Sequence, residues 1–135
     1  MIEKKINIAV IGIGYIGLPV SISFSKFFNT VAFDQDSFRI SELNKGFDRN
    51  LDYTKKELRK KNNKIIFTSN HRDIDQANIF IVCVPTPIFN SKKPNLNYLK
   101  KVSKLISPKL KTNDIVIYES TVYPGITEEF CIPMI

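Results

Sequence analysis

The chain has 135 residues, of which 43% are hydrophobic and 24% charged, and its formal net charge is +7. This length and composition are typical of one soluble globular domain and exclude a disordered chain. No apolar run reaches the ~20 residues of a membrane-spanning helix, and the first residues lack the pattern of a secretory signal, so we expect a cytoplasmic protein.

Charge and cysteine content limit the partners of the chain. Its basic side chains are spread over 55–64, 92–93 and 100–111, without interleaved aromatic residues or a nucleic-acid-binding motif. We therefore expect no nucleic-acid partner and interpret the charge as a solvated surface, although a positive field would also speed the capture of anionic ligands. Cys83 and Cys131 belong to no CxxC or Cys/His pattern, so we expect neither a disulfide framework nor a metal site.

The first half of the chain predicts a strand-helix-strand-helix unit. Residues 6–11 are almost continuously apolar, as in a strand buried on both faces. A helix is expected from Tyr15, with a buried face formed by apolar residues at helical spacing: Ile16, Val20, Phe24, Phe27 and Phe28. A second strand over 30–34 and a helix over 37–44, ended by Gly46, follow.

The second half continues this alternation. Thr54 and Glu57 have the spacing of a capping box at the start of a short polar helix within 51–63. Strands are predicted at 64–68, 78–84 and 114–119, a helical turn at 73–77, and a helix from a cap at Asn95 to about Ile106. Thr127 is expected to cap a further helix. The whole pattern predicts an α/β fold, a Rossmann-like doubly wound parallel sheet of strand order 3-2-1-4-5.

A glycine-rich motif opens the first helix. Gly12-Ile13-Gly14-Tyr15-Ile16-Gly17 directly follows the first strand, and Asp34 ends the second strand 20 positions after Gly14. Gly12 permits a tight turn, Gly14 admits a pyrophosphate to the backbone, and Gly17 lets the helix pack on the strand. The helix N-terminus would bind the phosphates of a dinucleotide, and Asp34 its ribose hydroxyls. Because Asp34 would repel a 2′-phosphate, the motif favours NAD over NADP; Arg39 could accommodate such a phosphate, but we favour a stacking or pairing role for it.

Two segments that carry hydroxyl groups follow the fourth and fifth strands. Residues 84–87 (Val-Pro-Thr-Pro) and 119–121 (Glu-Ser-Thr) fall at the carboxyl ends of strands, where ligands bind in open α/β sheets. They would contact the ribose and nicotinamide or position a water, but a hydroxyl-rich turn without a ligand explains them equally well. His71 is interpreted as a surface residue, and Asp73 and Asp75 as a helix N-terminus rather than an acid/base pair.

These segments together resemble a known family. Residues 8–19, Phe33-Asp34 with Arg39-Ile40, and 84–87 are similar to the amino-terminal NAD-binding domain of the UDP-glucose/GDP-mannose dehydrogenases. Residues 118–125 and 46–49 most resemble the members that oxidise UDP-N-acetylglucosamine or UDP-N-acetylgalactosamine for surface polysaccharides. Asn95 and Phe89-Asn90 depart from the family pattern in one loop.

The motifs and the resemblance together identify a set of expected cofactor contacts. The residues expected to bind NAD are Gly12, Gly14, Tyr15, Ile16, Gly17, Asp34, Arg39, Pro85, Thr86, Ser120 and Thr121. The resemblance also implies that Thr121 lies near the reacting carbon or its water, as an auxiliary catalytic residue.

The resemblance implies a reaction as well. Such enzymes oxidise the C6 alcohol of a UDP-hexose or UDP-N-acetylhexosamine to a uronate in two NAD-dependent steps, through a cysteine-bound intermediate. The nucleophilic cysteine, the dimer-spanning helix and the UDP-sugar-binding domain of the family are expected outside residues 1–135. We therefore expect an incomplete NAD-binding domain without turnover, from a protein that is a homodimer or higher oligomer when complete.

Other interpretations of the sequence remain. Neither Cys83 nor Cys131 is expected to be the nucleophile, because one lies in an apolar strand and the other near the end of the chain. The chain could be a non-catalytic dinucleotide-binding or interaction module. It could also be the NAD domain of another Rossmann dehydrogenase family.

Overall fold

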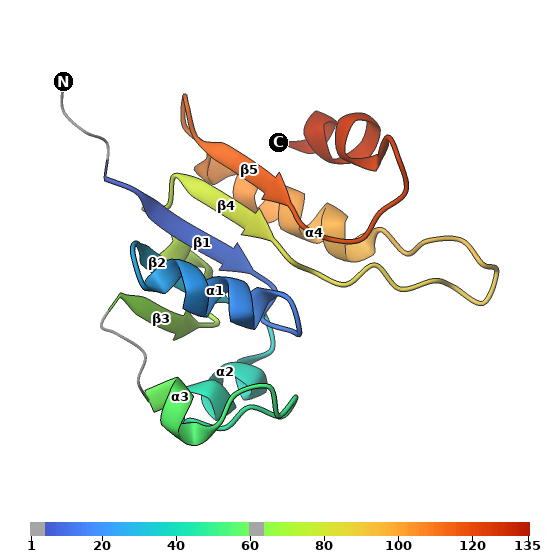
Figure 1. Ribbon diagram of the computed structural model, residues 1–135. Helices are drawn as coiled ribbons and strands as arrows, with labels where there is room; N and C mark the ends of the chain where they lie inside the picture. Colours follow the sequence, from blue (N-terminus) through green and yellow to red (C-terminus); the bar gives the residue numbers. More distant parts are fainter. Residues whose placement is uncertain (1–4, 60–63) are drawn as a thin grey trace.

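The computed structural model describes residues 5–59 and 64–135. Its centre is one sheet of five parallel strands in the order β3-β2-β1-β4-β5 (Figure 1). The strands are β1 (Asn7–Ile11), β2 (Asn29–Phe33), β3 (Ile65–Thr68), β4 (Ile79–Val82) and β5 (Ile115–Tyr118). The predicted doubly wound order is confirmed, and every strand lies within a predicted range except that β2 starts one residue earlier, at Asn29.

Burial explains the difference between the central and the edge strands. In β1, residues Ile8 to Ile11 are all at most 2% exposed, as expected for a strand covered on both faces. At the edge, β5 alternates instead: Ile115 and Ile117 are exposed, whereas Val116 and Tyr118 pack on the core. The sheet is therefore covered on both faces at its centre and on one face at the β5 edge.

Helices cover the two faces of the sheet. They are α1 (Gly17–Ser25), α2 (Ser37–Asn44), α3 (Lys55–Arg59) and α4 (Asn97–Ile106). Leu18 of α1, Leu43 of α2 and Leu58 of α3 belong to one core cluster, whereas Leu99 of α4 belongs to the cluster on the other face. Figure 1 shows α1 and α4 on opposite sides of the sheet. No helix of the described residues is long and apolar enough to cross a membrane.

The buried face of α1 agrees with the prediction only in part: of the expected residues, Val20 and Phe28 pack against the core cluster that contains Leu18. The helix ends at Ser25, and Ile16, Phe24 and Phe27 are exposed rather than packed on the sheet. Its buried residues are instead Gly17, Leu18, Ser21 and Ser25. Small side chains let the helix lie close to the sheet, and burial of the Ser21 hydroxyl is tolerated because it donates to the Gly17 carbonyl at 2.6 Å.

Three of the predicted helix ends are present. The helix α2 spans the predicted residues and is followed by Gly46, which has a φ of +80°. The capping box before α3 is confirmed, since the Thr54 N–H donates to Glu57 and the Glu57 N–H donates to Thr54. Residues 60–63 of that predicted segment lie outside the described residues. Before α4, the side chain of Asn95 accepts the N–H of Asn97 at 3.0 Å, although the residue directly before the helix is Leu96, which makes no side-chain cap.

The predicted cap at Thr127 is wrong. Thr127 already lies inside a π-helical turn (Thr127–Cys131), and the preceding Ile126 provides no side-chain cap. A short 3-10 turn (Ile132–Met134) follows. Ile126 and Cys131 are buried in the same core cluster as Leu99, so packing on the core rather than capping holds this segment.

Candidate dinucleotide-binding site

A pocket of about 790 Å³ lies along the carboxyl edge of the sheet. Every strand contributes to its wall through the residues that follow it: Gly12 after β1, Asp34 after β2, Ser69 after β3, Val84 after β4 and Glu119 after β5. This edge is where open α/β sheets bind ligands, and the volume falls within the range of small-molecule and cofactor sites. The topology therefore brings the separate sequence motifs into one site.

The pocket collects the residues predicted from the sequence. All of the expected cofactor-binding residues except Gly17 line it. Glu119, from the predicted segment 119–121, lines it as well. Further lining residues were not predicted: Gln35, Asp36, Arg49, Asn50, Ser69, His71, Tyr98, Lys101 and Leu105. Most of the unpredicted residues come from loops and from α4, and only the folded chain brings these to the same edge.

The three glycines of the first turn have different surroundings. A Cβ on Gly12, whose φ is +93°, would meet the Cys83 backbone at 3.0 Å, and a Cβ on Gly17 would lie 1.7 Å from the Gly12 carbonyl oxygen. Gly14 has no atom within 4 Å of its Cβ position. Gly12 and Gly17 are thus required by the turn itself, whereas Gly14 leaves an open approach to the backbone. That open side at the start of α1 fits a pyrophosphate.

Asp34 holds the glycine turn as well as lining the pocket. Its Oδ2 accepts the N–H of Ile13 at 2.7 Å, and its Oδ1 accepts the N–H of Asp36 at 2.9 Å. Each carboxylate oxygen has more than one lone pair, so both retain capacity to accept a ribose hydroxyl. The carboxylate is therefore fixed in place before any ligand arrives.

Arg39 is buried and holds the same turn from the other side. Its Nε donates to the Ile13 carbonyl at 3.0 Å, and its Nη1 lies 2.8 Å from Oδ1 of Asp48. The side chains of Arg39 and Asp48 are 5% and 0% exposed. Among the described residues, Nη1 meets Asp48 as a close ion pair without hydrogen-bond geometry, and Nη2 has no hydrogen-bond partner. Arg39 therefore takes a pairing role with Asp48, and its side chain also lines the pocket.

Asp48 is the anchor of that pair. It accepts the backbone N–H groups of Asn50, Asp52 and Tyr53 at 3.0–3.2 Å. Burial acts to raise the pKa of Asp48, but the side-chain contact with Arg39, the backbone N–H groups and the Arg39 charge outweigh it and lower the pKa. Asp48 is therefore ionised near neutral pH and balances the buried Arg39 charge.

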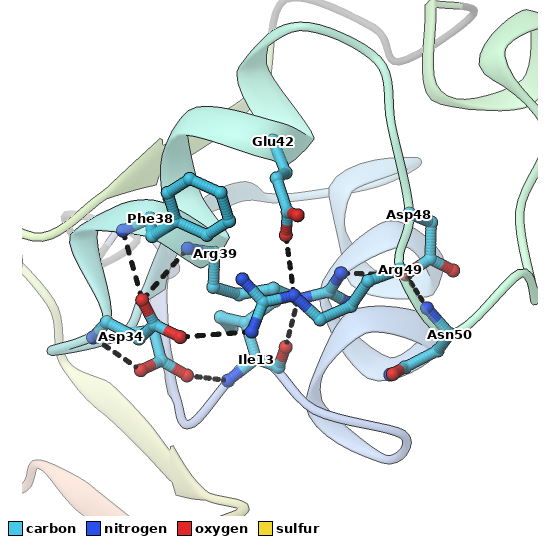
Figure 2. A network of polar contacts seen from close by, with 9 residues as sticks. Ile13, Asp34, Phe38, Arg39, Glu42, Asp48, Arg49 and Asn50 are labelled. Carbon is cyan, nitrogen blue, oxygen red and sulfur yellow. Dashed lines mark hydrogen bonds and ion pairs between the residues drawn. The ribbon is translucent and has the colours of Figure 1, made fainter.

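A second arginine lies at the same end of the pocket, on the surface. Arg49 Nε is 2.6 Å from Oε2 of Glu42, and its Nη1 is 3.2 Å from Oδ2 of Asp36. Its guanidinium carbon lies 5.4 Å from the centre of the Phe38 ring. Figure 2 shows this cluster beside Asp34 and Ile13. The backbone N–H of Arg39 at the α2 cap lowers the pKa of Asp36, and Arg49 lowers it further despite some desolvation.

The two hydroxyl-bearing loops are tied to one another. The Thr86 hydroxyl donates to the Thr121 carbonyl, and the Ser120 hydroxyl donates to the Val84 carbonyl at 2.6 Å. Both hydroxyl oxygens can still accept hydrogen bonds from a ligand. The predicted catalytic assistance by Thr121 stays a prediction, and the structure adds that its side chain is exposed and lines the pocket.

The remaining titratable candidates have mostly structural surroundings. Burial, with a smaller contribution from Glu119, raises the pKa of Cys83 to about 11, and burial also raises the pKa of Cys131. Neither thiol is therefore a ready nucleophile at neutral pH. His71 is exposed at the pocket wall, while Asp75 forms an ion pair with Lys109. Within residues 5–59 and 64–135, no group of His, Cys, Asp and Glu side chains is arranged to hold a metal ion.

Known proteins share this sequence and this fold. The chain is 48% identical over 132 residues to the UDP-N-acetyl-D-glucosamine 6-dehydrogenase of Pseudomonas aeruginosa, and the matched region covers 98% of this chain and 31% of that enzyme. It is 44% identical over 129 residues to Protein CapL of Staphylococcus aureus, covering 96% and 30% of the two chains. The UDP-D-ManNAc dehydrogenase structure from Pyrococcus horikoshii superimposes with a TM-score of 0.89 at 32% identity, over 96% of this chain and 32% of that one.

The family follows from these similarities and from the site. The chain spans about 31% of the length of the UDP-N-acetyl-D-glucosamine 6-dehydrogenases that it matches. The sequence profile of the "UDP-glucose/GDP-mannose dehydrogenase family, NAD binding domain" matches residues 6–135, which include all of the pocket residues named above. This chain belongs to the UDP-glucose/GDP-mannose dehydrogenase family and carries its NAD-binding fold.

Proposed function

We propose that the chain is the NAD-binding portion of a UDP-N-acetylhexosamine 6-dehydrogenase. The observation that carries this proposal is the pocket at the carboxyl ends of all five strands, with an open backbone at Gly14 and a fixed carboxylate at Asp34. The similarity to UDP-N-acetyl-D-glucosamine 6-dehydrogenases at 48% and 46% identity supports the substrate class.

The described residues provide a contact for each part of the cofactor. The pyrophosphate would lie over Gly14 at the N-terminus of α1, because the first backbone N–H groups of a helix have no intrahelical partner. The adenosine ribose would bind Asp34, at the end of the pocket that the buried Arg39 also lines. The loops with Thr86 and Thr121 would contact the nicotinamide half, which would supply the acceptor for a hydride from C6 of the sugar. In this proposal Thr121 assists the reacting carbon or its water.

The rest of the reaction requires groups from elsewhere. Cys83 lines the pocket, but its pKa of about 11 leaves it protonated at neutral pH, so it does not supply the nucleophile. We propose that residues 1–135 are part of one NAD-binding domain. In this proposal, the UDP-sugar-binding domain and the nucleophilic cysteine lie in segments that correspond to the other two thirds of the relatives. By the same family resemblance, the complete protein is a homodimer or higher oligomer in the cytoplasm.

Calorimetric titration of the purified chain tests the cofactor assignment. We expect NAD to bind more tightly than NADP, because Asp34 repels a 2′-phosphate. Gly14→Ala is the informative variant, since its methyl group occupies the proposed pyrophosphate path and, apart from its neighbours in the chain, meets no atom of residues 5–59 and 64–135 within 4 Å. Its NAD affinity should fall at least about tenfold, the equivalent of one hydrogen bond to a charged group, with the unfolding midpoint unchanged.

Two results would contradict the proposal. Tighter binding of NADP than of NAD would overturn the assignment of Asp34. Full NAD affinity in Gly14→Ala would place the pyrophosphate elsewhere. To test whether the chain alone lacks turnover, the chain is mixed with NAD and UDP-N-acetylglucosamine, and the formation of NADH is followed. Oxidation at the rate of a complete enzyme would show that no further segment is needed.

A further inference from the structure

The adenosine end of the pocket has the opposite charge to the chain as a whole. The chain carries a net charge of +7. At this end, however, Asp34, Asp36 and Glu42 contribute three carboxylates against the single guanidinium of Arg49, apart from the mutually neutralising pair of Arg39 and Asp48. A local excess of negative charge therefore surrounds the place where the adenosine ribose would lie.

Arg49 is the group at this end that could reverse that preference. An arginine close to the carboxylate that binds the ribose is the usual means of accommodating a 2′-phosphate. Arg49 is on the surface, it lines the pocket, and it is bonded to Asp36, two residues after Asp34. It is the more accessible of the two arginines, because Arg39 is 4% exposed and already paired with Asp48.

Two of the three nitrogens of the Arg49 guanidinium are bound to carboxylates. Glu42 takes Nε at 2.6 Å and Asp36 takes Nη1 at 3.2 Å, from opposite ends of the first two turns of α2. The Phe38 ring covers one flat side at 5.4 Å. A phosphate that approached Nε or Nη1 would have to displace a carboxylate, and both carboxylates repel it, so the guanidinium is held in a position that disfavours an anionic ligand.

We infer that Asp36 and Glu42 are specificity-determining residues, which exclude a 2′-phosphorylated dinucleotide by holding the Arg49 guanidinium. This inference rests on the proposed NAD site and adds to the direct repulsion by Asp34. It assigns the choice between NAD and NADP to a surface cluster as well as to the carboxylate that touches the ribose. Releasing Arg49 without altering Asp34 then creates a binding group for the 2′-phosphate.

The test is the double variant Asp36→Asn/Glu42→Gln. Asparagine caps a helix as well as aspartate does, so the two N–H groups that Asp36 accepts at the start of α2 keep their partner. We expect the NADP affinity, measured by calorimetry at constant ionic strength, to rise about tenfold, as for one new hydrogen bond to a charged group. The NAD affinity should change less than about threefold on the same scale.

Two further variants separate this mechanism from a general change of charge. Glu128→Gln/Glu129→Gln removes the same charge outside the pocket and should leave the ratio of NADP to NAD affinity unchanged. The triple variant Asp36→Asn/Glu42→Gln/Arg49→Gln should lose the gain in NADP affinity. A gain that persists in the triple variant, or that is equalled by the distant pair, overturns the inference.

The remaining outcomes are also decisive. An unchanged NADP affinity in the double variant, with normal NAD binding, overturns this inference and leaves the proposed function standing. Failure of the unmodified chain to bind NAD overturns the proposed function itself. If the double variant does not fold, Glu42→Gln alone is used, since Glu42 caps no helix; it should raise the NADP to NAD ratio in the same direction, and an unchanged ratio overturns the inference.

Discussion

Replacing Asp48 by asparagine should cost much of the stability of this domain. The substitution keeps the shape of the side chain but removes the negative charge that faces the buried guanidinium of Arg39 at 2.8 Å. Removing one partner of a buried ion pair typically costs about 3–5 kcal/mol, because the other charge is left uncompensated. The total free energy of unfolding of a domain is only about 5–15 kcal/mol.

The hydrogen bonds of Asp48 also predict that Asp48→Asn lowers the stability of the domain. Oδ1 accepts the N–H of Asn50, and Oδ2 accepts those of Asp52 and Tyr53. An asparagine NH2 group in either position would face donors instead of accepting from them. No rotation of the amide therefore restores the full set, and we place the loss within the range for a broken pair, at about 3–5 kcal/mol.

Urea unfolding followed by circular dichroism at neutral pH measures this loss. With a slope of about 1–3 kcal/mol per molar urea, a loss of about 3 kcal/mol moves the midpoint down by about 1–3 M. Asp52→Asn is the matched control, because the same chemical change is made at an exposed residue four positions away, where we expect a change within about 0.5 kcal/mol. A loss below about 1 kcal/mol in Asp48→Asn would refute the view that the pair is buried and uncompensated.

The remaining predictions concern pH, packing and thiol reactivity. Because folding lowers the pKa of Asp48, the stability that Asp48 contributes is fully present above its pKa in the unfolded chain, about 3.9, and is lost as the pH falls through its lower pKa in the folded chain. The difference in urea midpoint between the unmodified chain and Asp48→Asn should therefore shrink below about pH 4. Gly17→Ala, whose methyl would lie 1.7 Å from the Gly12 carbonyl oxygen, should lower the free energy of unfolding by about 3 kcal/mol or more, and a melting temperature equal to that of the unmodified chain would contradict the packing described. Cys83, with a pKa of about 11, should react with iodoacetamide at neutral pH far more slowly in the folded chain than in urea, as measured by mass spectrometry of its peptide; equal rates would show that the thiol is not buried.

Much of the fold could be predicted because its signals are local. The apolar run before Gly12 and the alternation of strands and helices were sufficient for the strand order, since short right-handed connections leave few alternatives. The buried face of α1 could be predicted only in part from apolar spacing, because close approach to the sheet selects small residues such as Ser21 over Phe24. The end of the chain was misjudged for a similar reason: packing of Cys131, not a cap at Thr127, sets that turn.

The site divides in the same way. The glycine turn, Asp34 and the two hydroxyl loops follow from the rule that carboxyl ends of parallel strands converge, so most of the pocket could be predicted. The partners of the arginines could not, because Arg49 reaches carboxylates 7 and 13 positions away across a helix. Arg39 was expected near the cofactor, but its pairing with Asp48 is visible only when the loop after α2 folds back.

The double use of Asp34 makes cofactor preference hard to change by the obvious substitution. Its two oxygens accept the N–H groups of Ile13 and Asp36. Even asparagine, which removes the charge and admits a 2′-phosphate, can accept only one of these two groups, so the backbone around the site is loosened. Evolution or design that begins at Asp34 would therefore weaken the binding of both NAD and NADP before it favoured either cofactor. A route through residues 36 and 42 leaves that turn intact, so a change of cofactor in this lineage should begin on the exposed face of α2.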